Sequence, residues 1–283
     1  MLPLPPNDLK ERRLMKSKKK VSSIPQRKSL SQVFLKEPWP CEEIADSFLA
    51  EKITSVIEVG PGGGALTKEL LNKNIKVFAI EKDERFAEYL QKELAPLYPK
   101  GLLTVVKEDV LDFNFPKHLV DHRDVTGICG NIPYSISTPI VSHILPNLES
   151  VKKATLLVQL EFAERLASPP KKKSYGSLSV YTQLRSQVCL EFIVPKECFK
   201  PIPKVDSAVI SFYKKENKHS EELLKKVEKV TKTSFSQRRK KLSNSLKPFL
   251  STMDSSKLTI DLERRCDSLT PQEFVQITKE LYE

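Results

Sequence analysis

Short apolar runs separated by helix-length stretches fill the chain from residue 53 onward, and this alternation restricts the fold more than any other feature. Five such runs occupy residues 55–59, 75–80, 102–106, 125–129 and 154–158. Buried parallel strands read as short apolar runs, and each parallel connection needs a crossover helix. The pattern therefore predicts an α/β fold built on a parallel sheet.

Two further β-rich runs follow, at residues 188–194 and 205–213. Only about ten residues separate them, which leaves no room for a crossover helix. We therefore expect an antiparallel hairpin at one edge of the sheet, which makes a mostly parallel sheet of seven strands.

The pattern changes after Tyr213, where strand signals stop. Apolar residues then recur at helical spacing in a background rich in Lys and Glu, at Leu223, Leu224, Val227 and Val230. The segment Thr270-Pro271-Gln272-Glu273 combines a capping Thr, a Pro at the first helical position and a Glu three residues after the cap. We expect a helical domain over residues 215–283, preceded by an α/β domain over residues 28–214.

The excess of basic residues lies at the two ends of the chain. Residues 1–28 hold nine basic and two acidic side chains, residues 29–213 hold 22 and 23, and residues 214–283 hold 16 and 11. Residues 1–27, with four prolines and a run of three lysines, are predicted to be a disordered basic arm. Basic ends on a neutral body favour a polyanion partner such as nucleic acid. The alternative is a set of solvated surfaces.

Several classes of protein are disfavoured. The chain has no stretch of about 20 apolar residues and no apolar segment near the N-terminus, so we expect no membrane partner and a cytoplasmic location. A mitochondrial transit peptide is the weaker interpretation of the Lys-rich arm. The five cysteines are scattered and are expected to be reduced thiols. His118 and His122 have no third ligand nearby, so no metal site is predicted.

A glycine-rich turn follows the first strand. Glu58 and Val59 lead into Gly60, Gly62 and two further glycines before the next helix, where the backbone turns sharply and a ligand approaches. Glu81 ends the second strand, 21 residues after Gly60, and is placed to accept hydrogen bonds from ribose hydroxyls. The pattern indicates an adenosine-containing cofactor. A tight turn without a ligand is the alternative.

The choice of cofactor depends on later strand ends. The turn also matches a dinucleotide fingerprint, with Ala65 in its third place, so a dehydrogenase stays open. Asp109 follows the third strand, where a carboxylate accepts from an adenine amino group. The fourth strand leads into Asn131-Ile132-Pro133-Tyr134, for which a nicotinamide enzyme has no use. These features favour S-adenosylmethionine.

The tetrapeptide suits methyl transfer to an amino group on a nucleobase. Such a nitrogen is a poor nucleophile because its lone pair is delocalised into the ring. The Asn131 side-chain oxygen and the Ile132 carbonyl are two acceptors that localise the lone pair, and Pro133 fixes φ. Tyr134 offers a face on which a flipped base stacks. A buried Tyr in an ordinary turn is the alternative interpretation.

Eight segments in order resemble the small-subunit rRNA adenine N6-dimethyltransferases (KsgA-like), from Ser29 to about Leu246. They are Leu30 to Leu35, the turn at Gly60, Glu81, Asp109, Asn131 to Thr138, Tyr175 to Val180, Phe199 to Ser207 and, in the helical region, Phe235 to Lys241. The resemblance implies a Rossmann-like class I methyltransferase domain. It also implies dimethylation of two adjacent adenosines in a hairpin near the 3′ end of 16S rRNA, late in small-subunit assembly.

The resemblance also implies roles for further residues. It places Val33 and Leu35 beside the cofactor, although the family generally has Gly and Asn where this chain has Ser31 and Val33. Because a lost side-chain contact would be restored, Val33→Asn is expected to tighten cofactor binding. Phe199, before the stiff Pro201-x-Pro203 stretch, is expected opposite Tyr134 around the base. A core Phe is the alternative.

A run of cations without an intervening acid marks the helical region. Its members, Arg238, Arg239, Lys240 and Lys241, are expected to bind the RNA backbone of the small ribosomal subunit, the predicted partner. Lys171 to Lys173 form a loop for which RNA contact and simple solvation are equally open. We expect a monomer. The alternatives are a large-subunit rRNA methyltransferase of the antibiotic-resistance type and a non-catalytic assembly factor.

Overall fold

The computed structural model describes residue 24 and residues 33–282, except for 123, 125, 217–218 and 251–257. The predicted arm over residues 1–27, apart from Ile24, lies outside the described residues, as do Leu30, Ser31 and Gln32.

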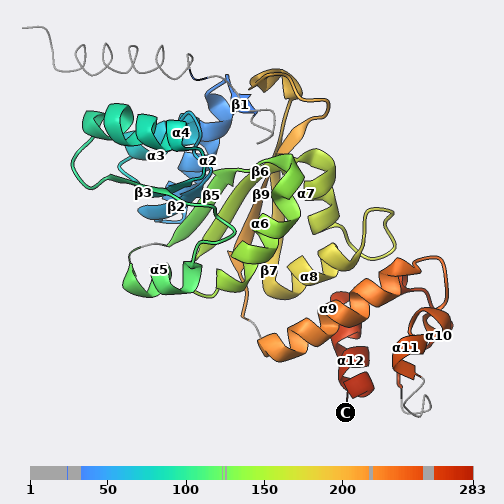
Figure 1. Cartoon of the computed structure of the whole chain (residues 1–283). Coiled ribbons are helices and arrows are strands. Elements are labelled where there is room, and N and C mark those ends of the chain that lie inside the picture. The colour runs from blue at the N-terminus through green and yellow to red at the C-terminus, as the bar shows by residue number, and fades with distance from the viewer. Residues whose placement is uncertain are drawn as a thin grey trace, which may run out of the picture. The chain divides into compact units, whose positions relative to one another are not determined.

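The main sheet has seven strands in the order β4-β3-β2-β5-β6-β9-β7 (Figure 1). The strands are β2 (Ser55–Val59), β3 (Lys76–Glu81), β4 (Leu103–Lys107), β5 (Gly127–Asn131), β6 (Lys153–Gln159), β7 (Ser186–Val194) and β9 (Ser207–Lys214). The strands from β4 to β6 in this order pair in parallel, with Ile57 opposite Phe78 on one side and Ile128 on the other. The predicted parallel sheet is confirmed.

Each parallel connection contains a helix. The helices are α3 (Ala65–Asn72), α4 (Glu84–Tyr89), α5 (Phe115–Asp121) and α6 (Ser137–Ile144), and α2 (Trp39–Ala50) precedes the first of these strands. Asp83 and Asn114 cap α4 and α5 with their side chains. A small antiparallel pair, β1 (Phe34–Leu35) with β8 (Phe199–Lys200), sets Leu35 opposite Phe199.

The chain divides into two compact units. One is made of Met1–Leu160 and Glu191–Phe212, and the other of Glu161–Leu190 and Tyr213–Glu283. Each unit has its own apolar core, with Phe48, Ile53 and Val56 buried in the first and Tyr175, Leu224 and Phe274 in the second. This division places residues 161–190 with the helices, whereas the sequence analysis placed them in the α/β domain. The predicted domain boundaries remain a prediction.

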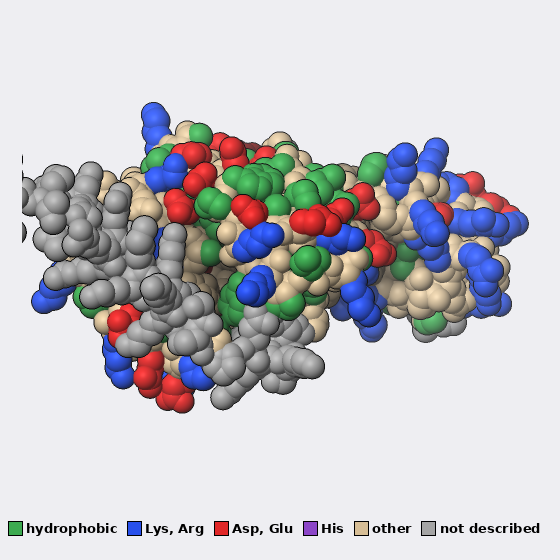
Figure 2. All heavy atoms as spheres, turned by 90° about the horizontal axis from the view of Figure 1, so that it is seen from above, with side chains coloured by type: hydrophobic (Ala, Val, Ile, Leu, Met, Phe, Trp, Pro, Cys, Tyr) green, Lys and Arg blue, Asp and Glu red, His purple; other side chains and the backbone are tan. Residues whose placement is uncertain are grey.

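The second unit is mainly helical. Its helices are α7 (Leu160–Ala167), α8 (Ser177–Arg185), α9 (Glu221–Ser236), α10 (Leu242–Ser245), α11 (Lys247–Leu250) and α12 (Pro271–Tyr282). Only the first residue of α7, Leu160, belongs to the other unit. The predicted capping box is present, because Glu273 N donates to Thr270 Oγ1 and Thr270 N donates to Glu273 Oε2. Figure 2 shows Lys and Arg side chains gathered over this unit. Among the described residues, no helix is both long and apolar enough to cross a bilayer.

Gly130 has little space around it, beside the predicted site. A Cβ atom at Gly130 would lie 2.4 Å from the carbonyl oxygen of Val59 on the neighbouring strand β2. We expect Gly130→Ala to lower the free energy of unfolding by about 1–3 kcal/mol, because overpacking shifts β5. Denaturant unfolding checks this. Gly176→Ala is the control, since the backbone there is extended and a Cβ meets nothing within 4 Å. Equal stability of the two variants would contradict the prediction.

Candidate active site

The predicted cofactor residues lie at the carboxyl ends of adjacent parallel strands. Glu58 lies on β2, Glu81 ends β3, Asp109 follows β4 by two residues, and Asn131 ends β5. The sheet order β4-β3-β2-β5 places these four ends side by side. Open α/β sheets bind ligands at this edge. The fold therefore brings together groups that are far apart in the sequence.

The glycine turn needs glycine for two reasons. Gly60, Gly62 and Gly64 all have positive φ values, of 64°, 50° and 75°. A Cβ atom at Gly62 would also lie 3.0 Å from Cε1 of Phe34, whereas one at Gly60 would meet nothing within 4 Å. The backbone at Gly60 therefore borders open space, which suits the close approach of a ligand. Sequence reasoning did not single out Phe34, since an aromatic residue in a short strand carries no signal of what it covers.

Glu81 is held by the turn. Gly62 N donates to its Oε2 at 2.9 Å, and Asp83 N donates to its Oε1 at 2.7 Å. The side chain is 7% exposed, and burial raises the pKa of its carboxyl. Each carboxylate oxygen has more than one acceptor position. The two backbone bonds therefore fix Glu81 and leave positions for ribose hydroxyls.

Glu58 is a buried acid with an unused oxygen. Its side chain is 1% exposed, and its Oε2 has no hydrogen-bond partner in the described part of the chain. Burial raises the pKa of its carboxyl to about 8; the neighbouring Thr67 acts against this rise, and the Glu81 charge adds to it. An orphaned buried acceptor beside a glycine turn suits a ligand that carries an ammonium group.

Asp109 is paired with a residue that the sequence analysis did not single out. Lys82 Nζ donates to Asp109 Oδ2 at 2.5 Å, and Leu111 N donates to Asp109 Oδ1 at 3.1 Å. The hydrogen bond from Lys82 lowers the pKa of Asp109, so the carboxylate is ionised and accepts hydrogen bonds. Lys82 directly follows Glu81, yet nothing in the sequence shows that its side chain reaches the end of the next strand.

Asn131 is oriented by the backbone at Val33. Its Nδ2 donates to the Val33 carbonyl oxygen at 3.2 Å, so the donor end of the amide is engaged. The acceptor end, Oδ1, then faces away from that carbonyl. Ile132 is buried at 1% exposure, and its N–H donates to Leu157 O at 3.3 Å. Pro133 has a φ of −59°, and Tyr134 begins the 3₁₀ turn Tyr134–Ile136.

The placement of Val33 beside the cofactor stays a prediction. Its side chain is partly buried and packs against the apolar core, as does Leu35, and its contact with the site is through the carbonyl. An Asn in that apolar contact has to leave a polar amide partly buried. The structure thus gives no support to the expectation that Val33→Asn tightens cofactor binding.

Tyr134 and Phe199 have different surroundings. The Tyr134 ring is half-buried, and its hydroxyl forms a 2.7 Å hydrogen bond with Ser207 Oγ. Phe199 is 1% exposed and belongs to the core of the first unit. The expectation that Phe199 presents its ring opposite Tyr134 is therefore not met, because β8 turns that side chain inward. Core packing is what the structure shows for Phe199.

The four cations predicted to bind RNA differ in their contacts within the protein. Arg238 Nη1 and Nη2 donate to the carbonyl oxygens of Lys173 and Lys172, at 2.6 and 2.9 Å. Lys241 Nζ forms an ion pair with Glu263. Arg239 and Lys240 are exposed, and their side chains have no hydrogen bond or ion pair within the described residues. Two of the four predicted RNA contacts are therefore engaged within the protein.

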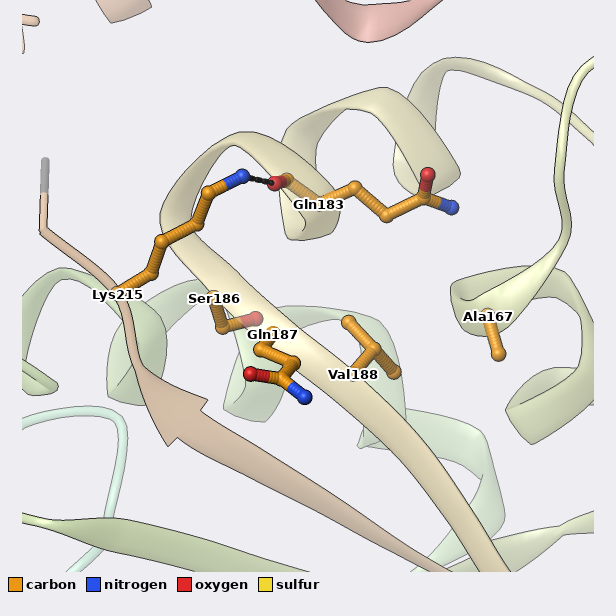
Figure 3. Close-up of a pocket in the computed structure, with 6 residues that line it drawn as sticks. All are labelled: Ala167, Gln183, Ser186, Gln187, Val188 and Lys215. Carbon is orange, nitrogen blue, oxygen red and sulfur yellow. Dashed lines mark hydrogen bonds between the residues drawn. The ribbon is translucent and has the colours of Figure 1, made fainter. Parts of the chain in front are cut away.

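A hollow of about 380 Å³ in the second unit holds none of the predicted site residues (Figure 3). Lys215 Nζ on its rim donates to Gln183 O at 3.1 Å. Figure 3 also shows that β9 ends beside the start of β7, so these edge strands run antiparallel, as predicted. We assign no ligand to this hollow.

Taken together, the strand ends fit S-adenosylmethionine. Glu58 would face its ammonium group, Glu81 its ribose and Asp109 its adenine, with Gly60 leaving room for the chain of the cofactor. Of the residues that the structure describes, none form a cluster of three or more groups able to bind a metal ion.

The raised pKa of Glu58 predicts a pH dependence of stability. The Glu58 carboxyl is protonated up to about pH 8 in the folded state but only up to about pH 4.5 in the unfolded state. The folded protein therefore loses stability as the pH rises between these values. We expect Glu58→Gln to flatten this slope, by at most about 1.4 kcal/mol per pH unit, in cofactor-free protein. Unfolding at several pH values measures it. Glu88→Gln, an exposed control, should keep the original slope. A flat profile in the wild-type chain would contradict the prediction.

Comparisons with known proteins show the family of this chain. A family model described as "Ribosomal RNA adenine dimethylase" matches residues 24–283. The proteins named "Ribosomal RNA small subunit methyltransferase A" from Chlorobium phaeobacteroides and Saccharophagus degradans are 37% and 35% identical. The alignments cover 93% and 90% of this chain and 96% and 94% of those proteins.

Two solved structures share the fold. A dimethyladenosine transferase from Plasmodium falciparum matches with a TM-score of 0.66 and 26% identity, over 86% of this chain and 95% of that one. The 23S rRNA methyltransferase ErmE matches with a TM-score of 0.66 and 24% identity, over 88% of this chain and all of that one. The chain belongs to the ribosomal RNA adenine dimethylase family and is a methyltransferase that uses S-adenosylmethionine.

Proposed function

We propose that this enzyme dimethylates N6 of two adjacent adenosines in a hairpin near the 3′ end of small-subunit (16S) rRNA, late in subunit assembly. The relatives at 35–37% identity carry small-subunit names, which supports this substrate over the large subunit. The likeness to ErmE extends to the fold alone. The monomer expected from the sequence stays a prediction.

The observation that carries the proposal is the orientation of Asn131. Because Nδ2 is held by the Val33 carbonyl, Oδ1 is the end left to accept a hydrogen bond from an adenine amino group. The Ile132 carbonyl is proposed as the second acceptor. Together they hold both N–H bonds of N6 and favour a pyramidal nitrogen with a localised lone pair.

The remaining residues position the base. Tyr134, fixed through its hydroxyl to Ser207, offers a ring on which a flipped adenine stacks, an interaction worth about 1–3 kcal/mol. When bound, S-adenosylmethionine would supply the methyl group of its sulfonium. The N6 lone pair would bond to that methyl carbon in line with the breaking C–S bond, and S-adenosylhomocysteine would leave. The reaction needs alignment more than acid–base catalysis, since N6 loses its proton to water after the transfer. No side chain is assigned as a base.

The substrate is tested with S-adenosylmethionine labelled in its methyl group. The enzyme is incubated with unmethylated small or large ribosomal subunits, and the product is mapped. We expect dimethyladenosine in the 3′ fragment of the small-subunit RNA. Label in the large subunit would favour the antibiotic-resistance type instead. Cofactor binding without transfer to either subunit would favour a non-catalytic assembly factor.

Replacement of Asn131 tests the transfer mechanism. We expect Asn131→Ala to lower kcat by roughly 10²- to 10³-fold, as removal of a single transition-state hydrogen-bonding group does elsewhere. Calorimetry should show cofactor affinity within about three-fold of the wild type, because the assigned contact is to the base. Asn131→Asp keeps an acceptor but loses the donor to Val33 O, so its rate should lie between those of the wild type and Asn131→Ala.

Asn147→Ala is the matched control, since that amide also donates to a backbone carbonyl, His143 O, at 2.9 Å. It should retain the wild-type rate. A near-normal rate for Asn131→Ala would overturn the assignment.

A further inference from the structure

Arg238 holds a loop. Its guanidinium donates two hydrogen bonds to consecutive carbonyl oxygens, those of Lys172 and Lys173, and its Nε lies 3.5 Å from Asp267 Oδ2. A planar fork that bridges two carbonyls uses the geometry specific to arginine, because a lysine ammonium is a point charge. The Arg238 side chain is only about one-third exposed. Two of its nitrogens are therefore committed to the loop over residues 169–175, here called the lysine loop.

The lysine loop is fastened at further points along its length. At its start, Gln183 Nε2 donates to Ser168 O at 2.8 Å. In the middle, Lys171 N donates to Asp267 O at 2.8 Å, with Lys171 in the left-handed region at a φ of 70°. At its end, the fully buried Tyr175 donates its hydroxyl to Leu269 O at 2.8 Å.

These bonds fix the backbone and leave the cations outside. The side chains of Lys171, Lys172 and Lys173 are exposed, and no hydrogen bond or ion pair joins them to the described residues. Three adjacent like charges repel one another, so fixing this loop costs free energy in the free protein. Arg239 and Lys240, also exposed, follow directly after the residue that fastens the loop.

A hollow lies at the foot of the loop. It measures about 320 Å³, and its lining includes Arg165, Lys173 and Arg238 against one acid, Glu161. The loop and the hollow belong to the same unit, so this cationic surface is formed within one compact body.

We propose that the lysine loop and the Arg239–Lys240 pair form one preorganised surface for the sugar-phosphate backbone of folded RNA, with Arg238 as the positioning residue. The inference rests on the proposed function, because it takes rRNA as the partner. It assigns RNA contact to the lysine loop, which the sequence left open, and gives Arg238 an indirect role.

The chemistry favours RNA phosphates as the occupant. Double-stranded and folded RNA is recognised by shape and by its phosphates, so cations at fixed positions matter more than base-reading groups. Fixing the loop in advance removes an ordering cost from binding. A phosphate chain also removes the mutual repulsion of the three lysines, which compensates for their placement.

The first test neutralises the loop without touching its fastening. We expect Lys172→Gln with Lys173→Gln to weaken binding to unmethylated small ribosomal subunits by roughly ten-fold. The slope of log K against log salt should become shallower by about 1.5, since two phosphate contacts are lost. The control is Lys225→Gln with Lys229→Gln, which removes two exposed lysines from α9 in the same unit. The control should keep the wild-type affinity and slope.

The second test separates positioning from direct contact. Arg238→Lys keeps the charge but cannot bridge two carbonyls, so we expect it to weaken subunit binding and to speed hydrogen exchange over residues 170–175. Arg239→Gln should weaken binding without changing that exchange. In the background of the loop double variant, Arg238→Lys should cause little further loss, whereas Arg239→Gln should cause its full loss.

Each other result overturns the inference. If Arg238→Lys binds subunits like the wild type, Arg238 acts by its charge. The same conclusion follows if Arg238→Lys weakens binding as much in the loop double variant as in the wild-type background. If the loop double variant binds subunits like the wild type, the loop is only a solvated surface. Weakened binding to subunits but not to protein-free small-subunit RNA would point to a ribosomal protein. If the wild-type chain binds no small subunits, the proposed function itself has failed.

Discussion

The register of neighbouring parallel strands is the constraint on which the active site depends. Strands β4, β3, β2 and β5 are adjacent and parallel, so their carboxyl ends meet at one edge of the sheet. Each contributes one polar side chain within two residues of that edge. A slip of one residue between strands would turn Glu58 to the opposite face of the sheet. The apolar core that fixes this register therefore also fixes the geometry of the cofactor site.

The site keeps two acids where burial disfavours their charge. Glu81 is stabilised by the Gly62 and Asp83 N–H groups, whereas one oxygen of Glu58 has no such partner in the described residues. Unsatisfied buried polar atoms are rare in folded proteins and gather where a ligand completes them. The glycine turn serves the same purpose, since its positive φ values allow Gly62 to reach Glu81 while Phe34 covers it.

The sequence was sufficient for the sheet, the helices after residue 220 and the capping box of α12, because periodicity, connection length and cap residues act locally. The hydrogen-bond partners of individual side chains were harder to predict from the sequence. The same Arg-Arg-Lys-Lys run contains Arg238, bound to the lysine loop, and Arg239, which is exposed. Formal charge is identical for both, and only the packing of residues some 65 positions earlier separates them. The burial of Phe199 was likewise unreadable, since a two-residue strand has too short a pattern to show which face is inward.

The contact between Asn131 and Val33 is made through the main chain, so it does not depend on the residue type at position 33. A side-chain contact to the cofactor depends on residue type, but every residue supplies a main-chain carbonyl. The pairing of β1 with β8 sets Phe34 opposite Lys200 and so fixes the peptide that carries the Val33 oxygen. Orientation of the Asn131 amide therefore survives an apolar residue at 33 as long as this short pairing is kept. The side chain at 33 is then free to pack against the apolar core, which is where Val33 lies.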